Sequence, residues 1–162
     1  MSPGRVIDGL QFARAGADIE GTLGPDELPR LIESGCSVDS IAYRIKGGIN
    51  GEGQPFLGIE ASGALRLVCQ RCLGPLEFPV EVDVELELSE DVAEIENADD
   101  DVDRVLATRS MDVAALVEDE LILALPFSPK HEACEVAEGA DRGERVSPFG
   151  VLEQLKRRRS EQ

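Results

Sequence analysis

The run from Val80 to Leu88 constrains the fold of this chain more than any other feature. Apolar and acidic residues alternate through it without exception: Val80, Glu81, Val82, Asp83, Val84, Glu85, Leu86, Glu87 and Leu88. Side chains of a β-strand point alternately to its two faces. The run therefore predicts a strand that buries one face in a core and turns an acidic face to water.

Two further runs predict neighbours for this strand. Apolar residues alternate with polar ones over residues 38–45 and again over residues 57–69, where Gly63 marks a bulge or bend. The short segment from Cys69 to Pro75 then leads into the acidic strand. We therefore expect a mostly antiparallel sheet with a hairpin from Leu57 to Leu88 around this turn.

One strong helical pattern follows the sheet. Asp112 is a suitable N-cap, apolar residues recur at the helical period as far as Leu125, and Pro126 ends the pattern. Residues 7–14 and 25–34 show weaker helical patterns. The fold class that we expect is α+β, with one main helix packed on the sheet.

Composition divides the rest of the chain. Residues 90–103 are densely acidic with little to bury, which predicts a mobile loop. Residues 136–147 are polar and contain glycine, as linkers do, and residues 148–162 can form a short amphipathic helix with a basic end. We expect a single domain over 1–135, a linker over 136–147 and a C-terminal tail over 148–162.

Two short pairs of metal-binding residue types stand out, Cys69-x-x-Cys72 and His131-x-x-Cys134. A gap of two residues lets both side chains of a pair reach one tetrahedral metal. Together the pairs are a candidate structural zinc site, if the fold brings the two turns together. The alternatives are a redox pair at Cys69 and Cys72, with Arg71 as the nearby cation, or thiols that bind nothing.

Glu120 falls inside the apolar stripe of the predicted helix. An ionised carboxylate at such a position is destabilising unless it is paired and hydrogen-bonded. We therefore expect a buried ion pair between Glu120 and Arg71, with Arg66 as the alternative cation. General acid or base chemistry at Glu120 is less favoured, because no nucleophile or phosphate-binding loop accompanies it. No catalytic residue is predicted.

The chain is strongly acidic, with 33 Asp and Glu, 16 Lys and Arg, and a formal net charge of -17. Such a charge repels nucleic-acid phosphates and favours a basic partner, although an acidic surface also serves solubility. The candidate partner-binding residues on the acidic strand are Glu81, Asp83, Glu85 and Glu87. The candidate contacts with RNA, in the tail alone, are Arg157, Arg158 and Arg159.

The chain shows neither a signal peptide nor an apolar run of the roughly 18 residues that cross a bilayer. We therefore expect a cytoplasmic protein without membrane contact. Because the cytoplasm keeps thiols reduced, the four cysteines favour metal ligation or burial over disulfides.

Several motifs in the same order resemble the YceD family. They are Leu67-Val-Cys-Gln-Arg-Cys72, Val117-Glu-Asp-Glu-Leu-Ile-Leu-Ala-Leu-Pro126, the downstream Cys134 and Pro148-Phe-Gly-Val-Leu-Glu-Gln-Leu-Lys156. The resemblance implies a role in the synthesis, processing or stability of 23S ribosomal RNA. It brings no established catalytic residues, and the family pattern specifies nothing at His131.

The resemblance implies a ribosome biogenesis factor, and the lack of a predicted catalytic residue favours a non-enzymatic one. Its expected partner is a basic ribosomal protein or a large-subunit precursor. The alternatives are a metal-dependent RNA-processing enzyme, or a regulator based on zinc or thiols. The sequence leaves the direct partner, the assembly step and the oligomeric state open.

Overall fold

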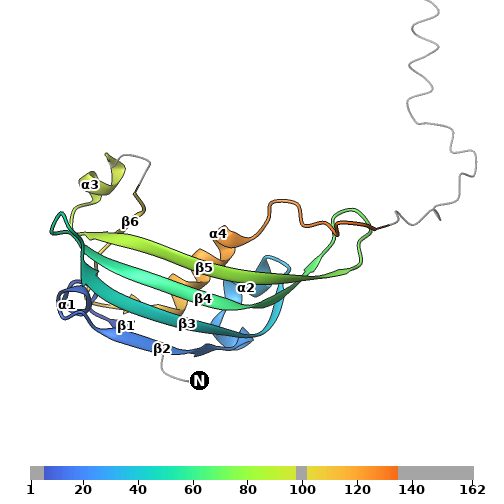
Figure 1. Ribbon diagram of the computed structural model, residues 1–162, viewed down its shortest axis with the longest axis horizontal. Helices are drawn as coiled ribbons and strands as arrows, with labels where there is room; N and C mark the ends of the chain where they lie inside the picture. Colours follow the sequence, from blue (N-terminus) through green and yellow to red (C-terminus); the bar gives the residue numbers. More distant parts are fainter. Residues whose placement is uncertain (1–5, 98–101, 135–162) are drawn as a thin grey trace, which may run out of the picture. The chain divides into compact units, whose positions relative to one another are not determined.

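The computed structural model describes residues 6–97 and 102–134. Residues Met1–Glu132 form one compact unit. Its main element is a five-stranded sheet in the order β2–β3–β4–β5–β6 (Figure 1). The strands are β2 (Asp18–Leu23), β3 (Ser37–Ile49), β4 (Pro55–Val68), β5 (Pro75–Ser89) and β6 (Arg104–Leu106).

Four of these strands form an antiparallel meander, and only the short β6 pairs with β5 in parallel. The alternation in the sequence produces the two faces of this meander. Apolar side chains of β3, β4 and β5 line the inner face, where the register places Tyr43, Ala61 and Val82 side by side. Charged residues occupy the positions between them and point to the opposite face.

A bulge interrupts the pairing of β3 with β4. The register shifts between Val38 and Ile41, so that two residues of β3 oppose one residue of β4. Gly63 lies opposite Ile41, and a Cβ atom there would come within 2.6 Å of the Ile41 Cδ1 atom and 3.0 Å of the Ser40 carbonyl oxygen. The bend predicted at Gly63 is thus present, although the extra residue belongs to β3.

Helices α2 (Pro29–Glu33) and α4 (Val113–Ala124) contact each other and pack against the sheet (Figure 1). Asp112 caps α4 by accepting hydrogen bonds from the amides of Ala114 and Ala115. The apolar stripe of α4 and the apolar residues at the start of α2 complete the core. Their fully buried side chains are Leu28, Leu31, Val113, Val117 and Leu121.

Short elements complete this part of the chain. They are helix α1 (Gly9–Arg14), the 3-10 helix η1 (Pro25–Glu27) and helix α3 (Val92–Glu96). Strand β1 (Val6–Ile7) pairs antiparallel with β7 (Met111–Asp112), which directly precedes α4. The described residues before α1 are thereby tied to the start of the main helix.

The predicted fold class is confirmed: the protein is α+β, with a mostly antiparallel sheet and one main helix. The predicted acidic loop is partly ordered into α3, while residues 98–101, the linker 136–147 and the tail 148–162 lie outside the described residues. No helix in residues 6–97 or 102–134 has the length and apolar character needed to cross a membrane.

Candidate metal centre

Cys69 and Cys72 lie in the tight turn that joins β4 to β5. The Cys69 amide donates to the Gly74 carbonyl at 2.9 Å, and the Leu73 amide donates to the Cys69 carbonyl at 2.9 Å. Leu73 adopts a φ of 60°, in the left-handed region that a side chain with a Cβ seldom occupies. The turn therefore holds both cysteines in a compact backbone loop.

His131 reaches this turn from the segment that follows α4. Pro126 ends the helical region, and the Pro129 carbonyl then accepts a hydrogen bond from the Gln70 amide at 2.8 Å. The Arg71 guanidinium donates to the His131 carbonyl at 3.4 Å. Backbone contacts therefore attach the post-helix segment to the hairpin turn independently of any metal.

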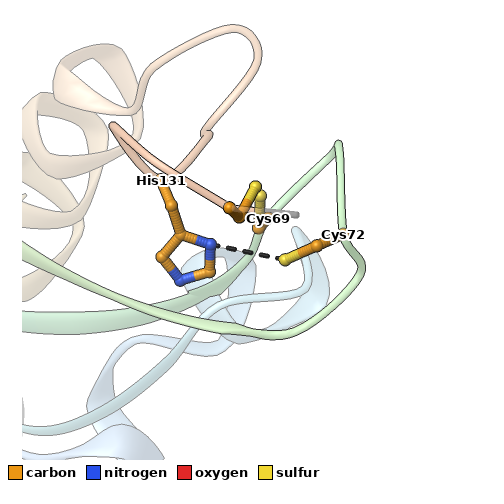
Figure 2. Close-up of side chains that lie close together, drawn as sticks. Cys69, Cys72 and His131 are labelled. Carbon is orange, nitrogen blue, oxygen red and sulfur yellow. Dashed lines mark hydrogen bonds between the residues drawn. The ribbon is translucent and has the colours of Figure 1, made fainter. Parts of the chain in front are cut away.

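The two ring nitrogens of His131 have different partners. Nδ1 lies 3.4 Å from the Sγ atom of Cys72 (Figure 2). Nε2 lies 2.9 Å from the Pro75 carbonyl oxygen. A carbonyl only accepts, so Nε2 carries the proton and Nδ1 presents its lone pair. A histidine that binds a metal through one nitrogen typically donates the other N–H to a carbonyl or carboxylate in this way.

Cys134 supplies the fourth ligand atom. One ligand atom from each of Cys69, Cys72, His131 and Cys134 can be chosen so that all four lie within 4.8 Å of one another. Ligands of tetrahedral zinc, with Zn–S near 2.3 Å and Zn–N near 2.0–2.1 Å, lie about 3.3–3.8 Å apart. A small contraction would bring the group to that geometry, and none of the four cysteines forms a disulfide.

The Cys69 sulfur is prepared for a metal by its surroundings. Its pKa is lowered to about 5, chiefly by the backbone N–H of Cys72 and further by the N–H groups of His131 and Arg71. The Cys69 side chain is buried, which opposes this shift without cancelling it. These N–H groups favour the thiolate of Cys69, the form in which cysteine binds metals.

Three thiolates and one imidazole fill the four positions of a tetrahedral zinc ion. Such closed sites are structural, whereas catalytic zinc sites keep one position open for water or substrate. The group can therefore hold a metal that ties the β4–β5 turn to the post-helix segment. The spacing of the two sequence pairs predicted these four residues, and they lie together.

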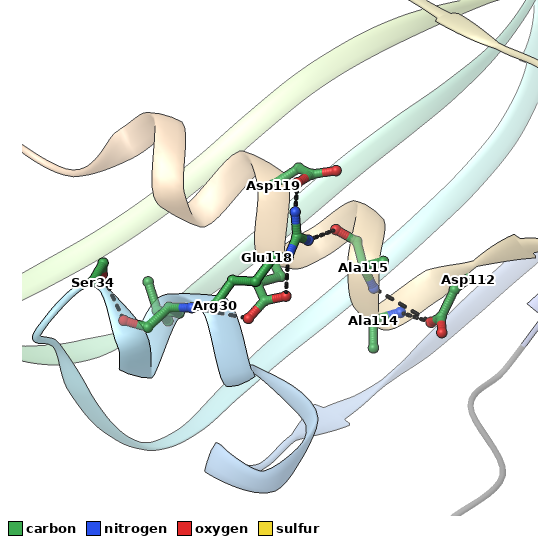
Figure 3. Close-up of polar contacts among 8 residues, drawn as sticks. Arg30, Ser34, Asp112, Ala114, Ala115, Glu118 and Asp119 are labelled. Carbon is green, nitrogen blue, oxygen red and sulfur yellow. Dashed lines mark hydrogen bonds and ion pairs between the residues drawn. The ribbon is translucent and has the colours of Figure 1, made fainter.

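The buried carboxylate of α4 is Glu118, for which the sequence pattern predicted neither burial nor an ion pair. Its side chain is 3% exposed, pairs with the Arg30 Nε atom at 2.8 Å and accepts a hydrogen bond from the Leu31 amide at 2.9 Å (Figure 3). Arg30 also pairs with Asp119. This network joins α4 to the first turn of α2 and is structural.

Glu120 and Arg71 were predicted to form an ion pair, and the structure shows no ion pair between them. Glu120 is half-buried and forms no ion pair with any residue described in the structure. Burial raises its pKa, and the nearby Asp103 and Asp119 raise it further. Arg66, the alternative cation, pairs with Asp39 on the neighbouring strand.

The acidic face of the sheet contains paired and unpaired carboxylates. Arg44 pairs with Asp18, and Lys46 pairs with Glu60, whereas no ion pair with Glu81, Asp83 or Glu85 occurs in residues 6–97 or 102–134. We call these three side chains of β5 the acidic row. An open hollow of about 330 Å³ adjoins it, lined in part by Arg44, Glu60, Glu81 and Asp83.

Glu87 does not belong to this row, although it continues the same alternation. Its residue is 9% exposed, and its carboxylate binds Arg104 at 2.9 Å and the Asn50 amide at 2.8 Å. It therefore joins the turn after β3 to the start of β6. Arg157, Arg158 and Arg159 lie outside the described residues.

Two comparisons with known proteins bear on the function. No solved structure matches the chain. A family model described as "Large ribosomal RNA subunit accumulation protein YceD" matches residues 57–156, which include most of β4, all of β5 and α4, and all four candidate metal ligands. The match spans well over half of the 162 residues, and the chain therefore belongs to the YceD family.

Proposed function

We propose that this protein is a non-enzymatic factor of the cytoplasm that supports the accumulation of 23S ribosomal RNA. It acts by binding a basic ribosomal protein or a large-subunit precursor through the acidic row. The family description, large ribosomal RNA subunit accumulation, supports the ribosomal part of this proposal. The acidic row, without cationic partners among the described residues, is the observation that carries the binding part.

Unlike Asp18 and Glu60, the carboxylates of the acidic row have no ion-pair partner among the described residues. Its carboxylates alternate along one strand, so neighbouring charges stand about 7 Å apart and repel each other. A row of Lys and Arg side chains from a partner would relieve this repulsion. The chain's net charge of -17 would also accelerate the encounter with a basic partner, with a rate that falls as salt rises.

Direct RNA binding is assigned at most to the C-terminal segment. The acidic body repels phosphates, whereas Arg157, Arg158 and Arg159 can each neutralise one phosphate and release its counterions. The tail would then contact RNA close to the bound ribosomal protein. Its contribution is expected to be modest and strongly dependent on salt.

The metal centre serves this function as a structural zinc site. A closed set of three thiolates and one imidazole has no free position for a reacting water, which argues against a metal-dependent hydrolase. Zinc would hold the β4–β5 turn, and with it the start of β5, in one conformation. The acidic row begins on the same strand, so the zinc site would keep its presentation constant.

The test is recovery of partners from growing cells on tagged full-length protein at low and moderate salt, with bound proteins and RNA identified. We expect a basic ribosomal protein or large-subunit precursors, lost as salt rises. The triple reversal Glu81→Lys, Asp83→Lys and Glu85→Lys should abolish this recovery. Unchanged recovery by this variant would contradict the proposal.

A matched control separates the acidic row from net charge. Asp26, Glu33 and Glu52 are exposed residues outside the row, and their reversal to lysine changes the charge by the same amount. The control variant should still recover the ribosomal partner. Equal loss in both variants would show that overall charge, rather than the acidic row, carries the binding.

A further inference from the structure

Strand β5 has an edge that is only partly occupied. One side of β5 pairs with β4 from Pro75 to Glu87. On the other side, β6 pairs only with residues Glu87–Ser89. Within the part of the chain that the structure describes, no strand pairs with this edge before Glu87.

The backbone groups along the open edge can be identified from its occupied end. The Glu87 amide donates to the Asp103 carbonyl at 2.9 Å, and the Ser89 carbonyl accepts from the Ala107 amide at 2.8 Å. Backbone groups of successive residues point to opposite sides of a strand, and β5 pairs with β4 without a register shift. The N–H and C=O groups of Glu81, Asp83 and Glu85 therefore face the open edge.

Proline positions mark where the usable edge begins. Pro75 and Pro79 occupy the same alternate positions as the acidic row, where a missing N–H removes no bond to β4. Beyond Pro79, each of these positions offers both a donor and an acceptor as far as the start of β6. The open edge is thus a continuous template over Val80–Leu86.

We propose that the ribosomal partner adds an extended segment to this edge as an extra strand, with Lys or Arg at every second position. This inference rests on the proposed function and specifies its mode of docking. Cross-strand neighbours share a face, so the basic side chains of the guest would lie beside Glu81, Asp83 and Glu85. Its backbone would bind the amides and carbonyls of the same three residues.

Charge complementarity favours a basic strand over a second copy of this chain as the occupant of the open edge. Antiparallel pairing of two β5 edges would place carboxylates of both acidic rows opposite one another, and like charges directly opposite are destabilising. A basic strand reverses the sign of that interaction. The guest's remaining side chains would face the inner layer, where Val84 is only partly buried, so small residues fit there.

Amide hydrogen exchange tests the docking mode on full-length protein. The amides of Glu81, Asp83 and Glu85 should exchange rapidly in the free protein, while those of Val82 and Val84 are protected by β4. The probe is a short synthetic peptide in which Lys alternates with Thr. Its binding should slow exchange at the three acidic-row amides by at least about tenfold.

A second peptide separates strand addition from charge attraction alone. It has the same composition, with all lysines in one block and all threonines in another. We expect the alternating peptide to bind at least about tenfold more tightly and to protect the edge amides. Equal affinity of both peptides, without protection of these amides, would overturn strand addition while leaving the proposed function in place.

Amide hydrogen exchange in the free protein shows whether the open edge is already covered. Slow exchange of the Glu81, Asp83 and Glu85 amides before any peptide is added would show that the edge is already covered and would overturn the inference. Removal of residues 148–162 or dilution would then identify the cover as the tail or a second copy. Failure of the proposed function would be recognised separately, because the tagged protein would then recover no ribosomal partner from cells.

Discussion

The Nδ1 atom of His131 lies 3.4 Å from the Sγ atom of Cys72, although the two residues are 59 positions apart. The Nε2 atom of the same ring contacts the Pro75 carbonyl oxygen, which fixes the tautomer in which the Nδ1 lone pair can bind a metal. The backbone around the turn thus orients the imidazole before any metal arrives. A preoriented ligand set loses less conformational entropy when the metal binds.

Zinc content is the first prediction. Protein purified under reducing conditions should hold about one zinc ion per chain, because four ligands complete one tetrahedral site. At a free zinc concentration about 1,000 times the Kd, binding adds about 4 kcal/mol to the free energy of unfolding. Metal analysis and thermal unfolding before and after chelation measure both quantities.

Cysteine variants give the control for this prediction. Cys69→Ser should remove most of the bound zinc and the stabilisation that zinc provides. Cys36→Ser changes a buried cysteine beside Ser34, outside the group, and should leave the zinc content unchanged. Zinc-free protein that unfolds identically with and without added zinc would show that the thiols have no metal role.

Loss of the Glu118 carboxylate is the second prediction. Glu118→Ala leaves the buried Leu31 amide without its acceptor, which costs about 1–3 kcal/mol of unfolding free energy. Asp119→Ala removes an exposed partner of the same Arg30 and should cost less than about 1 kcal/mol. Urea unfolding of both variants measures the difference. Equal effects would mean that the buried hydrogen bond contributes nothing.

The third prediction concerns pH. Glu120 has a pKa above its ordinary value of 4.5 because burial and the nearby Asp103 and Asp119 disfavour its charged form. The folded state therefore loses stability through this group as pH rises from about 4.5 through the raised pKa. Glu120→Gln should match the parent protein at about pH 4 and be more stable at pH 7, by less than about 1 kcal/mol.

Urea midpoints at the two pH values test the Glu120 prediction. Glu90→Gln makes the same charge change at an exposed residue, and it controls for the net charge of the chain. A gain at pH 7 that appears equally in both variants would assign the effect to net charge. A loss at pH 7 on Glu120→Gln alone would mean that the ionised carboxylate has a stabilising partner.

Two glycines of β4 give the fourth prediction. Gly63→Ala brings a methyl group against Ile41 and the Ser40 carbonyl at the bulge, and should destabilise the fold by about 1–3 kcal/mol. Gly58→Ala meets only ordinary contacts, 3.8 Å to the Lys46 carbonyl oxygen and 4.0 Å to Phe56. It should change stability by less than about 1 kcal/mol. Chemical denaturation of the two variants checks the contrast.

The long strands and α4 were predictable because each repeats one pattern over many residues. The alternation of β5 and the helical period of α4 both reflect burial of one side of a long element. Strands β1, β6 and β7 have only two or three residues each, too few for a period, so no pattern predicts them. Their pairing depends on contacts between distant parts of the chain.

The four candidate metal ligands were predictable from the spacing of their two pairs, whereas the buried ion pair was not. The helical period places Glu120 inside the apolar stripe of α4 and Glu118 about 100° from Val117, at the margin of the stripe. The helix pattern alone therefore indicates the wrong residue of the two. Packing of α2 against one side of α4 buries Glu118 beside Arg30, and that packing is a tertiary contact without a local signal.

The pairing of β1 with β7 has a consequence for the order of folding during synthesis. Strands β2 to β5 are neighbours in sequence, so their hairpins close short loops and can form as soon as they leave the ribosome. Val6 can pair with Asp112 only after residue 112 has been translated, and α4 follows directly after Asp112. The part of the meander's apolar inner face that α4 covers therefore stays exposed until α4 has been translated.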